Sequence, residues 1–219
     1  MFRKSKLAPA ALCLLAMGAL RAQDNGPAVL QIKAGEAADH VSPMLYGLMT
    51  EEINYSCDGG LYGELARNRN FKEDAQNPVQ WQLIQEGGTG SMALDVGQGF
   101  NEAVPASLKP TIAAASGKQQ VGVANEGFWG MPVRPNSRYR ALFYAKAGPG
   151  FNGPLTVAIT SNDGATTQAS ARVTGLTGFW KKYEVILTTG KVAASAENRL
   201  MISANQAGAL WLGFVPLFP

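Results

Sequence analysis

The sequence has few of the residues that usually build a disulfide or a metal site. Its 219 residues include two cysteines and one histidine. Cys13 lies in an apolar N-terminal run, so removal of that run leaves Cys57 without an intrachain disulfide partner. A zinc site of Cys and His ligands needs more such side chains than this chain has. His40 is the only candidate for a Ser-His-Asp site.

Charged residues are also scarce, at 16% of the chain. Four of the 19 basic residues lie within residues 1–22, which leaves 15 basic against 16 acidic residues in the remainder. A nearly neutral chain without a basic patch argues against nucleic acid or an anionic membrane surface as a partner. We expect no cofactor and no metal in a catalytic role. Loop oxygens could hold a structural calcium ion, but no motif points to such a site.

The first 22 residues have the layout of a secretory signal peptide. Arg3, Lys4 and Lys6 precede an apolar run, residues 7–20, made of small and aliphatic side chains. The run is shorter than the roughly 20 residues that span a bilayer. We therefore expect a secreted or periplasmic protein with no membrane attachment after cleavage, and the alternative is a retained anchor.

Alternation with period two dominates the chain beyond Pro78 and predicts half-buried strands. Expected strands cover residues 92–95, 110–115, 120–125, 139–146, 155–160, 169–173, 183–187, 200–204 and 210–218. Gly and Pro turn signals separate them. This spacing predicts an all-β fold, an antiparallel β-sandwich of jelly-roll type over residues 77–219. The last run is apolar on both faces, so we expect it to be covered by something absent from this chain.

Residues 23–76 read as a separate N-terminal segment. A strand is expected over residues 28–34, and a buried strand over 45–52 ends in Glu51 and Glu52. A turn at residues 58–60 then leads to a short helix over Leu61, Tyr62 and Leu65. Neighbouring strand residues point to opposite faces, so Glu51 and Glu52 cannot form the carboxylate pair of a glycosidase, which needs spacings of about 5 to 9.5 Å across one sugar. One of them can still bind a sugar hydroxyl.

The stretch Val123–Gly130 carries Asn125-Glu126, a dipeptide with which many barrel-type sugar hydrolases place their acid/base. Here it lies within the all-β pattern and no second carboxylate motif follows. We therefore expect no catalytic residue in this chain and a loop at this point of the sandwich. Phe128 and Trp129 could offer a flat apolar face to a sugar ring. The alternative places Trp129 in the sandwich core.

Several of these motifs together resemble a known family. Residues 42–54 (SPMLYGLMTEEIN), residues 58–62 (DGGLY) and residues 67–69 (RNR) are similar to the start of secreted α-L-arabinofuranosidases of glycoside hydrolase family 51. Residues 121–136, 139–146 and 180–183 resemble the carbohydrate-binding-module-like sandwich of those enzymes. The resemblance covers residues 27–219.

This resemblance implies a chain plan in which residues 45–52 form the first strand of a (β/α)₈ barrel and the sandwich is inserted just after it. Residues 28–34 would belong to a C-terminal β-sandwich. Glu51 matches the strand-end glutamate that contacts the arabinose, so it is the expected substrate-binding residue, whereas Glu52 departs from relatives that have His there. The acid/base and nucleophile glutamates of the retaining mechanism would follow Pro219.

Three functions remain open on the sequence. The first is the N-terminal fragment of an exported arabinofuranosidase that removes arabinose from arabinoxylan or arabinan, plant cell-wall polysaccharides used in arabinose metabolism. The second is a stand-alone, non-catalytic carbohydrate-binding module. The third is a structural sandwich without affinity for sugars.

We expect the 219-residue polypeptide to show no hydrolase activity by itself, because it holds no counterpart of either catalytic glutamate. Release of the aryl group from an aryl α-L-arabinofuranoside by the purified chain measures this. Turnover above the buffer rate would contradict the prediction.

Overall fold

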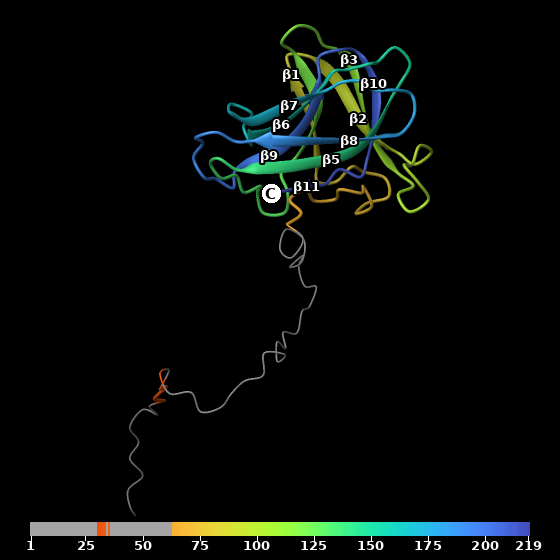
Figure 1. The fold of residues 1–219 in the computed structure, drawn as a ribbon. Coiled ribbons are helices and arrows are strands. Elements are labelled where there is room, and N and C mark those ends of the chain that lie inside the picture. The colour runs from red at the N-terminus through yellow and green to blue at the C-terminus, as the bar shows by residue number, and fades with distance from the viewer. Residues whose placement is uncertain (1–29, 34, 36–62) are drawn as a thin grey trace, which may run out of the picture. The chain divides into compact units, whose positions relative to one another are not determined.

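A computed structural model describes residues 30–33, 35 and 63–219. The chain divides into two compact units, Met1–Met49 and Thr50–Pro219, and the described part of the second is the sandwich (Figure 1). Within the first unit, residues 30–33 form no strand, contrary to the strand expected over 28–34, and Leu30 and Ile32 are exposed. The strand expected over 45–52 lies outside the described residues. No helix suited to crossing a bilayer occurs in the described ranges.

Eleven strands make up the sandwich, all in antiparallel pairs. They are β1 (Trp81–Glu86), β2 (Thr89–Asp95), β3 (Ser107–Ala114), β4 (Gln120–Asn125), β5 (Arg138–Ala147), β6 (Leu155–Ser161), β7 (Thr167–Val173), β8 (Lys181–Thr188), β9 (Asn198–Ala204), β10 (Gly208–Gly213) and β11 (Leu217–Phe218). One sheet has the order β1-β4-β9-β6-β7. In the other sheet, β5 pairs with β8, β10 and β11. β10 in turn pairs with β3, and β3 pairs with the edge strand β2.

The strand order confirms the jelly roll expected from the sequence. Counting β3 to β10 as strands one to eight, the sheets read 2-7-4-5 and 1-8-3-6, which is the order produced when two Greek keys fold over each other. The consecutive strands β1 and β2 add one edge strand to each sheet, β1 beside β4 and β2 beside β3. The sequence missed β1 because its burial does not alternate.

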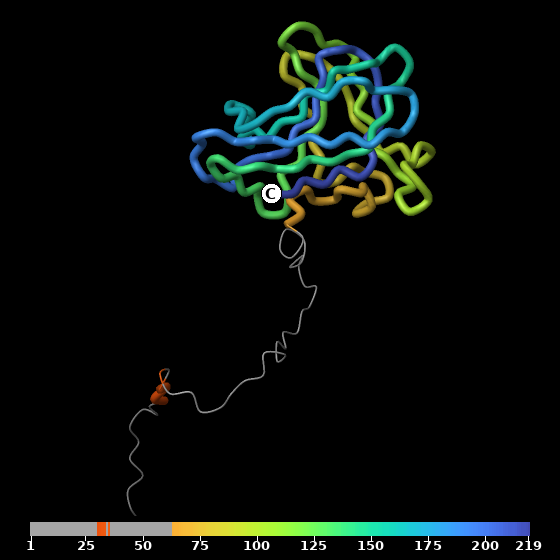
Figure 2. Tube along the Cα trace, in the orientation of Figure 1, coloured from red at the N-terminus to blue at the C-terminus, as the bar shows by residue number. Residues whose placement is uncertain are grey.

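The core lies between the sheets, where every second side chain points inward. In β5, for example, Ala141, Phe143 and Ala145 are fully buried. Figure 2 traces the two layers and the loops that close their ends. Strands predicted from alternation recur here, with the run 210–218 divided between β10 and β11.

The expectation that residues 210–218 need a cover absent from this chain is wrong for the inward side chains of the run, whereas Trp211, Phe214 and Phe218 are half-buried. Leu212, Val215 and Leu217 are fully buried by the chain itself. The cover includes the segment before β1: the Leu65 amide donates to the Leu217 carbonyl at 2.8 Å, and the Val215 amide donates to the Arg69 carbonyl at 2.7 Å. An extended segment can satisfy an exposed strand edge in this way.

Residues 64–71, assigned by the sequence to the N-terminal segment, thus pack in the same core as the strands. Leu65, Ala66 and Phe71 are buried in the main hydrophobic cluster. The structure forms no helix at Leu65, in contrast to the expected short helix. The domain boundary after residue 76 remains a prediction about the whole chain plan, but packing continues across it.

Glu64 fixes the C-terminal strand from inside the protein. Its Oε1 accepts hydrogen bonds from the Ala66 amide at 2.8 Å and the Leu217 amide at 2.9 Å. Its Oε2 is buried without a hydrogen-bond partner in the described chain, and the Nε of Arg69 lies 3.6 Å away. Burial raises the pKa of Glu64, an effect that the two amides and Arg69 oppose without cancelling.

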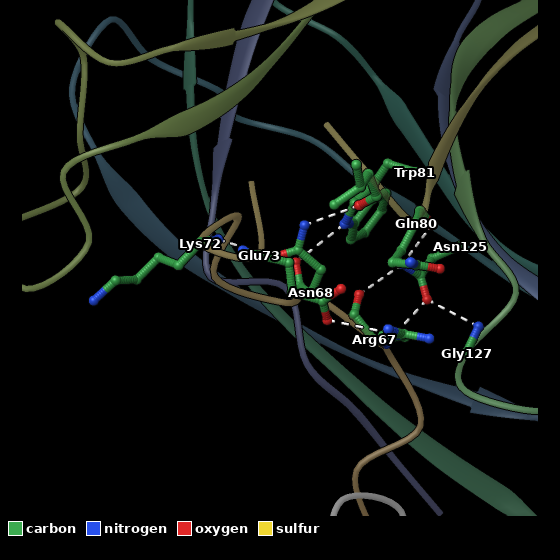
Figure 3. Close-up of polar contacts among 9 residues, drawn as sticks. Arg67, Asn68, Lys72, Glu73, Gln80, Trp81, Asn125 and Gly127 are labelled. Carbon is green, nitrogen blue, oxygen red and sulfur yellow. Dashed lines mark hydrogen bonds and ion pairs between the residues drawn. The ribbon is translucent and has the colours of Figure 1, made fainter. Parts of the chain in front are cut away.

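Two buried asparagines hold the segment before β1 against β4 (Figure 3). Asn125, at the end of β4, uses its whole amide: its Nδ2 donates to the carbonyls of Arg67 at 2.8 Å and Gln80 at 3.0 Å. Its Oδ1 accepts from the amides of Arg67 at 3.1 Å and Gly127 at 3.0 Å. A primary amide offers two donors and two acceptor lone pairs, so this side chain is fully satisfied.

Asn68 plays the corresponding role one residue after Arg67. Its Oδ1 accepts from the amides of Lys72 and Glu73, and its Nδ2 donates to the Val79 carbonyl at 2.8 Å. Its own carbonyl accepts from the Trp81 indole at 3.2 Å. Asn68 therefore binds both ends of the loop that runs from Asn68 to Trp81, and holds them together.

Replacing Glu64 by Gln should change how stability depends on pH. The raised pKa means that the folded protein binds the proton more tightly than the unfolded chain. The Glu64 contribution is therefore complete below the ordinary carboxyl pKa of about 4.3 and is lost as pH rises through the folded value. We expect the unfolding free energy of the native protein, relative to Glu64→Gln, to fall in urea titrations as the pH rises above about 4. Glu197→Gln, at an exposed site, is the matched control. A pH-independent difference for Glu64→Gln would contradict the raised pKa.

Asn125→Ala should destabilise the sandwich by about 2 to 4 kcal/mol, because four hydrogen bonds are lost and buried backbone groups are left unpaired. Urea unfolding measures the loss. Asn205→Ala, which removes one exposed hydrogen bond to the Gly117 carbonyl, is the control and should cost less than about 1 kcal/mol. Equal losses of unfolding free energy in the two variants would show that the four hydrogen bonds of Asn125 stabilise the sandwich no more than one exposed hydrogen bond does.

Candidate functional site

The loop Glu126–Gly130 follows β4, and its backbone conformation depends on its two glycines, Gly127 and Gly130. Gly127 and Gly130 have positive φ values of 74° and 94°. A Cβ at Gly127 would lie 2.7 Å from the Leu65 carbonyl oxygen, and one at Gly130 would lie 2.4 Å from that of Ala196. Only glycine combines this conformation with so close a backbone approach. The loop is thus seated on the segment that Asn125 anchors.

Phe128 and Trp129 project from this loop. Trp129 is 74% exposed, so the alternative that placed it in the sandwich core is wrong. The Phe128 ring is half-buried, and its centroid lies 6.3 Å from that of Trp129 with the planes tilted by 41°. The expected loop on the sandwich is confirmed. The sugar-stacking role of the two rings remains a prediction.

A cavity of about 350 Å³ opens beside Phe128. It is lined by Gln80, Trp81, Gln82, Glu126, Gly127, Phe128, Gly130 and Asn162. These residues come from the start of β1, the loop after β4 and the β6–β7 hairpin. The cavity therefore combines Phe128 and Glu126, both from the loop that the sequence singled out, with the polar side chains of Gln80, Gln82 and Asn162, which the sequence analysis did not identify.

The polar groups offer both donors and acceptors. The Gln82 amide donates to the Glu126 carboxylate at 3.1 Å, and both side chains remain accessible. The Oδ1 of Asn162 is buried and has no hydrogen-bond partner in the described part of the chain. Buried polar atoms are normally paired, so this oxygen is an unused acceptor at the wall of the cavity, which a ligand hydroxyl reaches only if the Asn162 side chain moves.

Glu126 is the only carboxylate among the residues that line this cavity. Glycoside hydrolysis by the usual mechanisms needs two carboxyl groups on either side of the scissile bond. The cavity can bind a sugar, but that chemistry needs a second acid. Asn125, the other half of the dipeptide that resembles an acid/base motif, is fully buried and occupied by the backbone. Glu51 lies outside the described residues.

Metal binding has no obvious location here. Across the described chain, no three or more His, Cys, Asp or Glu side chains gather in an arrangement that could hold a metal ion. The β6–β7 turn at residues 162–164, which contains Asp163, is a hairpin turn in which the Gly164 amide donates to the Ser161 carbonyl at 2.9 Å.

The known proteins that this chain is similar to in sequence are α-L-arabinofuranosidases. No family model matches the chain. A probable α-L-arabinofuranosidase A of Aspergillus flavus is 33% identical over 190 residues, which cover 84% of this chain and 29% of the relative. α-L-Arabinofuranosidase 1 of Arabidopsis thaliana is 29% identical over 208 residues, covering 90% of this chain and 30% of the relative. The chain thus spans less than a third of the length of these relatives.

Solved structures agree with the sequence relatives. The arabinose-bound GH51 α-L-arabinofuranosidase MgGH51 superposes with a TM-score of 0.70 and 30% identity, over 79% of this chain and 29% of that one. A CBM4 structure shares the fold alone, with a TM-score of 0.50 and 20% identity over 70% of this chain and 99% of that one. A cyclase from Fischerella sp. does so too, at 0.53 and 14% over 70% of this chain and 95% of that one.

The cyclase shows that this sandwich does not itself fix a function. The family assignment rests instead on identity that extends over most of the chain, in proteins from fungi and a plant and in a structure of the same family. Over most of its length, this chain is similar to the N-terminal part of the α-L-arabinofuranosidases of glycoside hydrolase family 51, of which it spans less than a third.

Proposed function

We propose that the chain supplies an exported α-L-arabinofuranosidase with a polysaccharide-binding sandwich and one substrate-binding strand. The complete enzyme would remove terminal α-L-arabinofuranosyl residues from arabinoxylan or arabinan by a retaining mechanism with two glutamates. Glu51 would contact the arabinose, and residues 1–22 would direct export. The observation that carries the binding role is the cavity beside Phe128, which joins an aromatic ring to polar side chains.

The position of the sandwich's ends supports an insertion into a larger catalytic domain. A Cβ built at Gly63 would lie 3.3 Å from Pro219, so the described chain enters and leaves the sandwich at adjacent points. A domain with neighbouring ends can be inserted into another without separating its flanking strands. This geometry is therefore compatible with the enzyme fragment.

Sugar binding at the cavity follows from its chemistry. A pyranose or furanose ring presents apolar C–H groups on its faces and hydroxyls around its rim. The exposed Trp129 and the adjacent Phe128 can pack against a face, while Gln82, Glu126 and the Oδ1 of Asn162 can pair with hydroxyls. The glycines of the loop hold the two rings in place, which reduces the entropy lost on binding.

Trp129→Ala should abolish the retardation of the chain in native gels that contain arabinoxylan or arabinan, while leaving its thermal unfolding midpoint unchanged. The side chain is 74% exposed, so its removal costs contact with the ligand rather than core packing. Phe179→Ala, at a site 83% exposed on the β7–β8 connection, is the matched control and should be retarded like the native chain.

Two results would count against the proposal. The first is equal retardation of the native chain and Trp129→Ala. The second is absence of retardation by either polymer, which would leave the sandwich as a structural part of the enzyme.

A further inference from the structure

A second set of aromatic residues lies on the outer face of the other sheet. Ala141, Phe143 and Ala145 of β5 point into the core, so Tyr144 and Lys146 point outward. Lys146 is paired in register with Trp211 of β10, which places their side chains next to each other on the same face. None of these residues belongs to the cavity beside Phe128, which lies at the end of the five-stranded sheet.

Trp211 is held in one orientation by its neighbours. Its indole N–H donates to the Asp95 carboxylate on β2 at 2.8 Å. The ammonium groups of Lys109 on β3 and Lys146 on β5 each lie 4.9 Å from its ring centroid. Lys146 also lies 5.2 Å from the centroid of Trp180. Cations over aromatic faces are favourable contacts that keep both groups ordered.

Three further rings extend this surface. The Phe100 centroid lies 3.8 Å from that of Tyr144 and 6.0 Å from that of Trp180. Gly213 faces Tyr144 in the register of β10 and β5, and a Cβ there would come within 2.8 Å of the Phe100 Cβ. A side chain at Gly213 would therefore displace the ring of Phe100. All four aromatic residues, Phe100, Tyr144, Trp180 and Trp211, are half-buried rather than enclosed.

A cavity of about 380 Å³ adjoins Trp211 and Lys146. Its other lining residues are Ala147, Gly148, Pro149 and Gly178. A Cβ at Gly148 would lie 3.4 Å from the Trp211 ring and 3.0 Å from the Ala209 carbonyl oxygen. Small residues thus leave the edge of the indole accessible from this side.

Lys109 and Lys146 form no ion pair within the described residues, although the Asp95 carboxylate accepts from the indole of the same Trp211. Within the described residues, the ion pairs of this face join Glu184 to Arg140 and Lys182, and none includes Lys109 or Lys146. The Lys146 ammonium does donate to the side chain of Gln98. Each ammonium therefore retains donors for an incoming anion, beside an apolar ring surface.

We propose that this face binds a carboxylate-bearing polysaccharide, with a uronic-acid carboxylate on Lys146 and Lys109 and sugar C–H groups against the aromatic surface. The inference rests on the proposed function in one respect, which is that the sandwich serves an enzyme acting on polysaccharides. A neutral arabinan has no carboxylate to pair with the two ammonium groups. An acidic peptide would use the ammonium groups but lacks the sugar C–H groups that can pack against the half-buried aromatic residues of this face.

The test is binding of polygalacturonate to the full 219-residue chain at about 0.15 M salt, by affinity electrophoresis and calorimetry. The double variant Lys109→Gln with Lys146→Gln should bind at least about tenfold more weakly, since two charge-assisted contacts are lost. The matched control is Lys118→Gln with Lys191→Gln, which removes the same charge from exposed connections outside this face and should bind like the native chain.

Two further polymers separate the contributions. Fully methyl-esterified polygalacturonate keeps the sugar and removes the charge, and it should bind as weakly as the double variant binds the acid. Polyglutamate keeps the charge and removes the sugar, so binding equal to that of polygalacturonate would overturn a sugar site. Equal losses in the two double variants would also overturn it, as would absence of binding.

The Trp129→Ala variant keeps the two proposals apart. It should bind polygalacturonate like the native chain even where its retardation by arabinoxylan is lost. Loss of polygalacturonate binding in Trp129→Ala would assign the acid to the cavity beside Phe128 and overturn the second site.

Discussion

The buried amide of Asn125 is the contact on which the arrangement of this sandwich depends. It joins three pieces of backbone that are distant in sequence: Arg67, Gln80 and the turn at Gly127. A buried amide is stable only when its hydrogen-bonding groups are paired, so the three pieces must come together for any of them to be placed. The position of the loop that carries Phe128 and Trp129 follows from this one side chain.

The segment before β1 is consequently part of the sandwich. Glu64 binds the Leu217 amide, Leu65 pairs with the same strand, and Asn68 closes the connection to Trp81. The apolar C-terminal strands obtain their cover from this segment. Because the segment and the last strand are neighbours, the two ends of the sandwich also lie together. One set of contacts thus accounts for the buried C-terminal run and for the compatibility with insertion in a larger enzyme.

The two candidate binding surfaces of this sandwich hold their aromatic side chains in place in different ways. Near Phe128, glycines and a buried amide hold a loop at the end of one sheet. On the other sheet, strand register itself brings Trp211 beside Lys146, and a hydrogen bond to Asp95 fixes the ring. The first combination suits neutral hydroxyls and a ring face. The second adds two ammonium groups that form no ion pair within the described residues, which suits a carboxylate.

The sequence by itself determined the strands with regular alternation, the jelly-roll sandwich and the family, because period-two burial and local motifs are readable along the chain. It also located the loop of Phe128 and Trp129. Only the tertiary structure decided that Trp129 is exposed, that Asn125 and Glu64 are structural, and that Trp211 lies between Lys109 and Lys146. These contacts join residues far apart in sequence, and no local pattern encodes which strands become neighbours. The same reason explains why we did not predict strand β1, and why we expected the cover of residues 210–218 to come from outside this chain. Both depend on long-range packing.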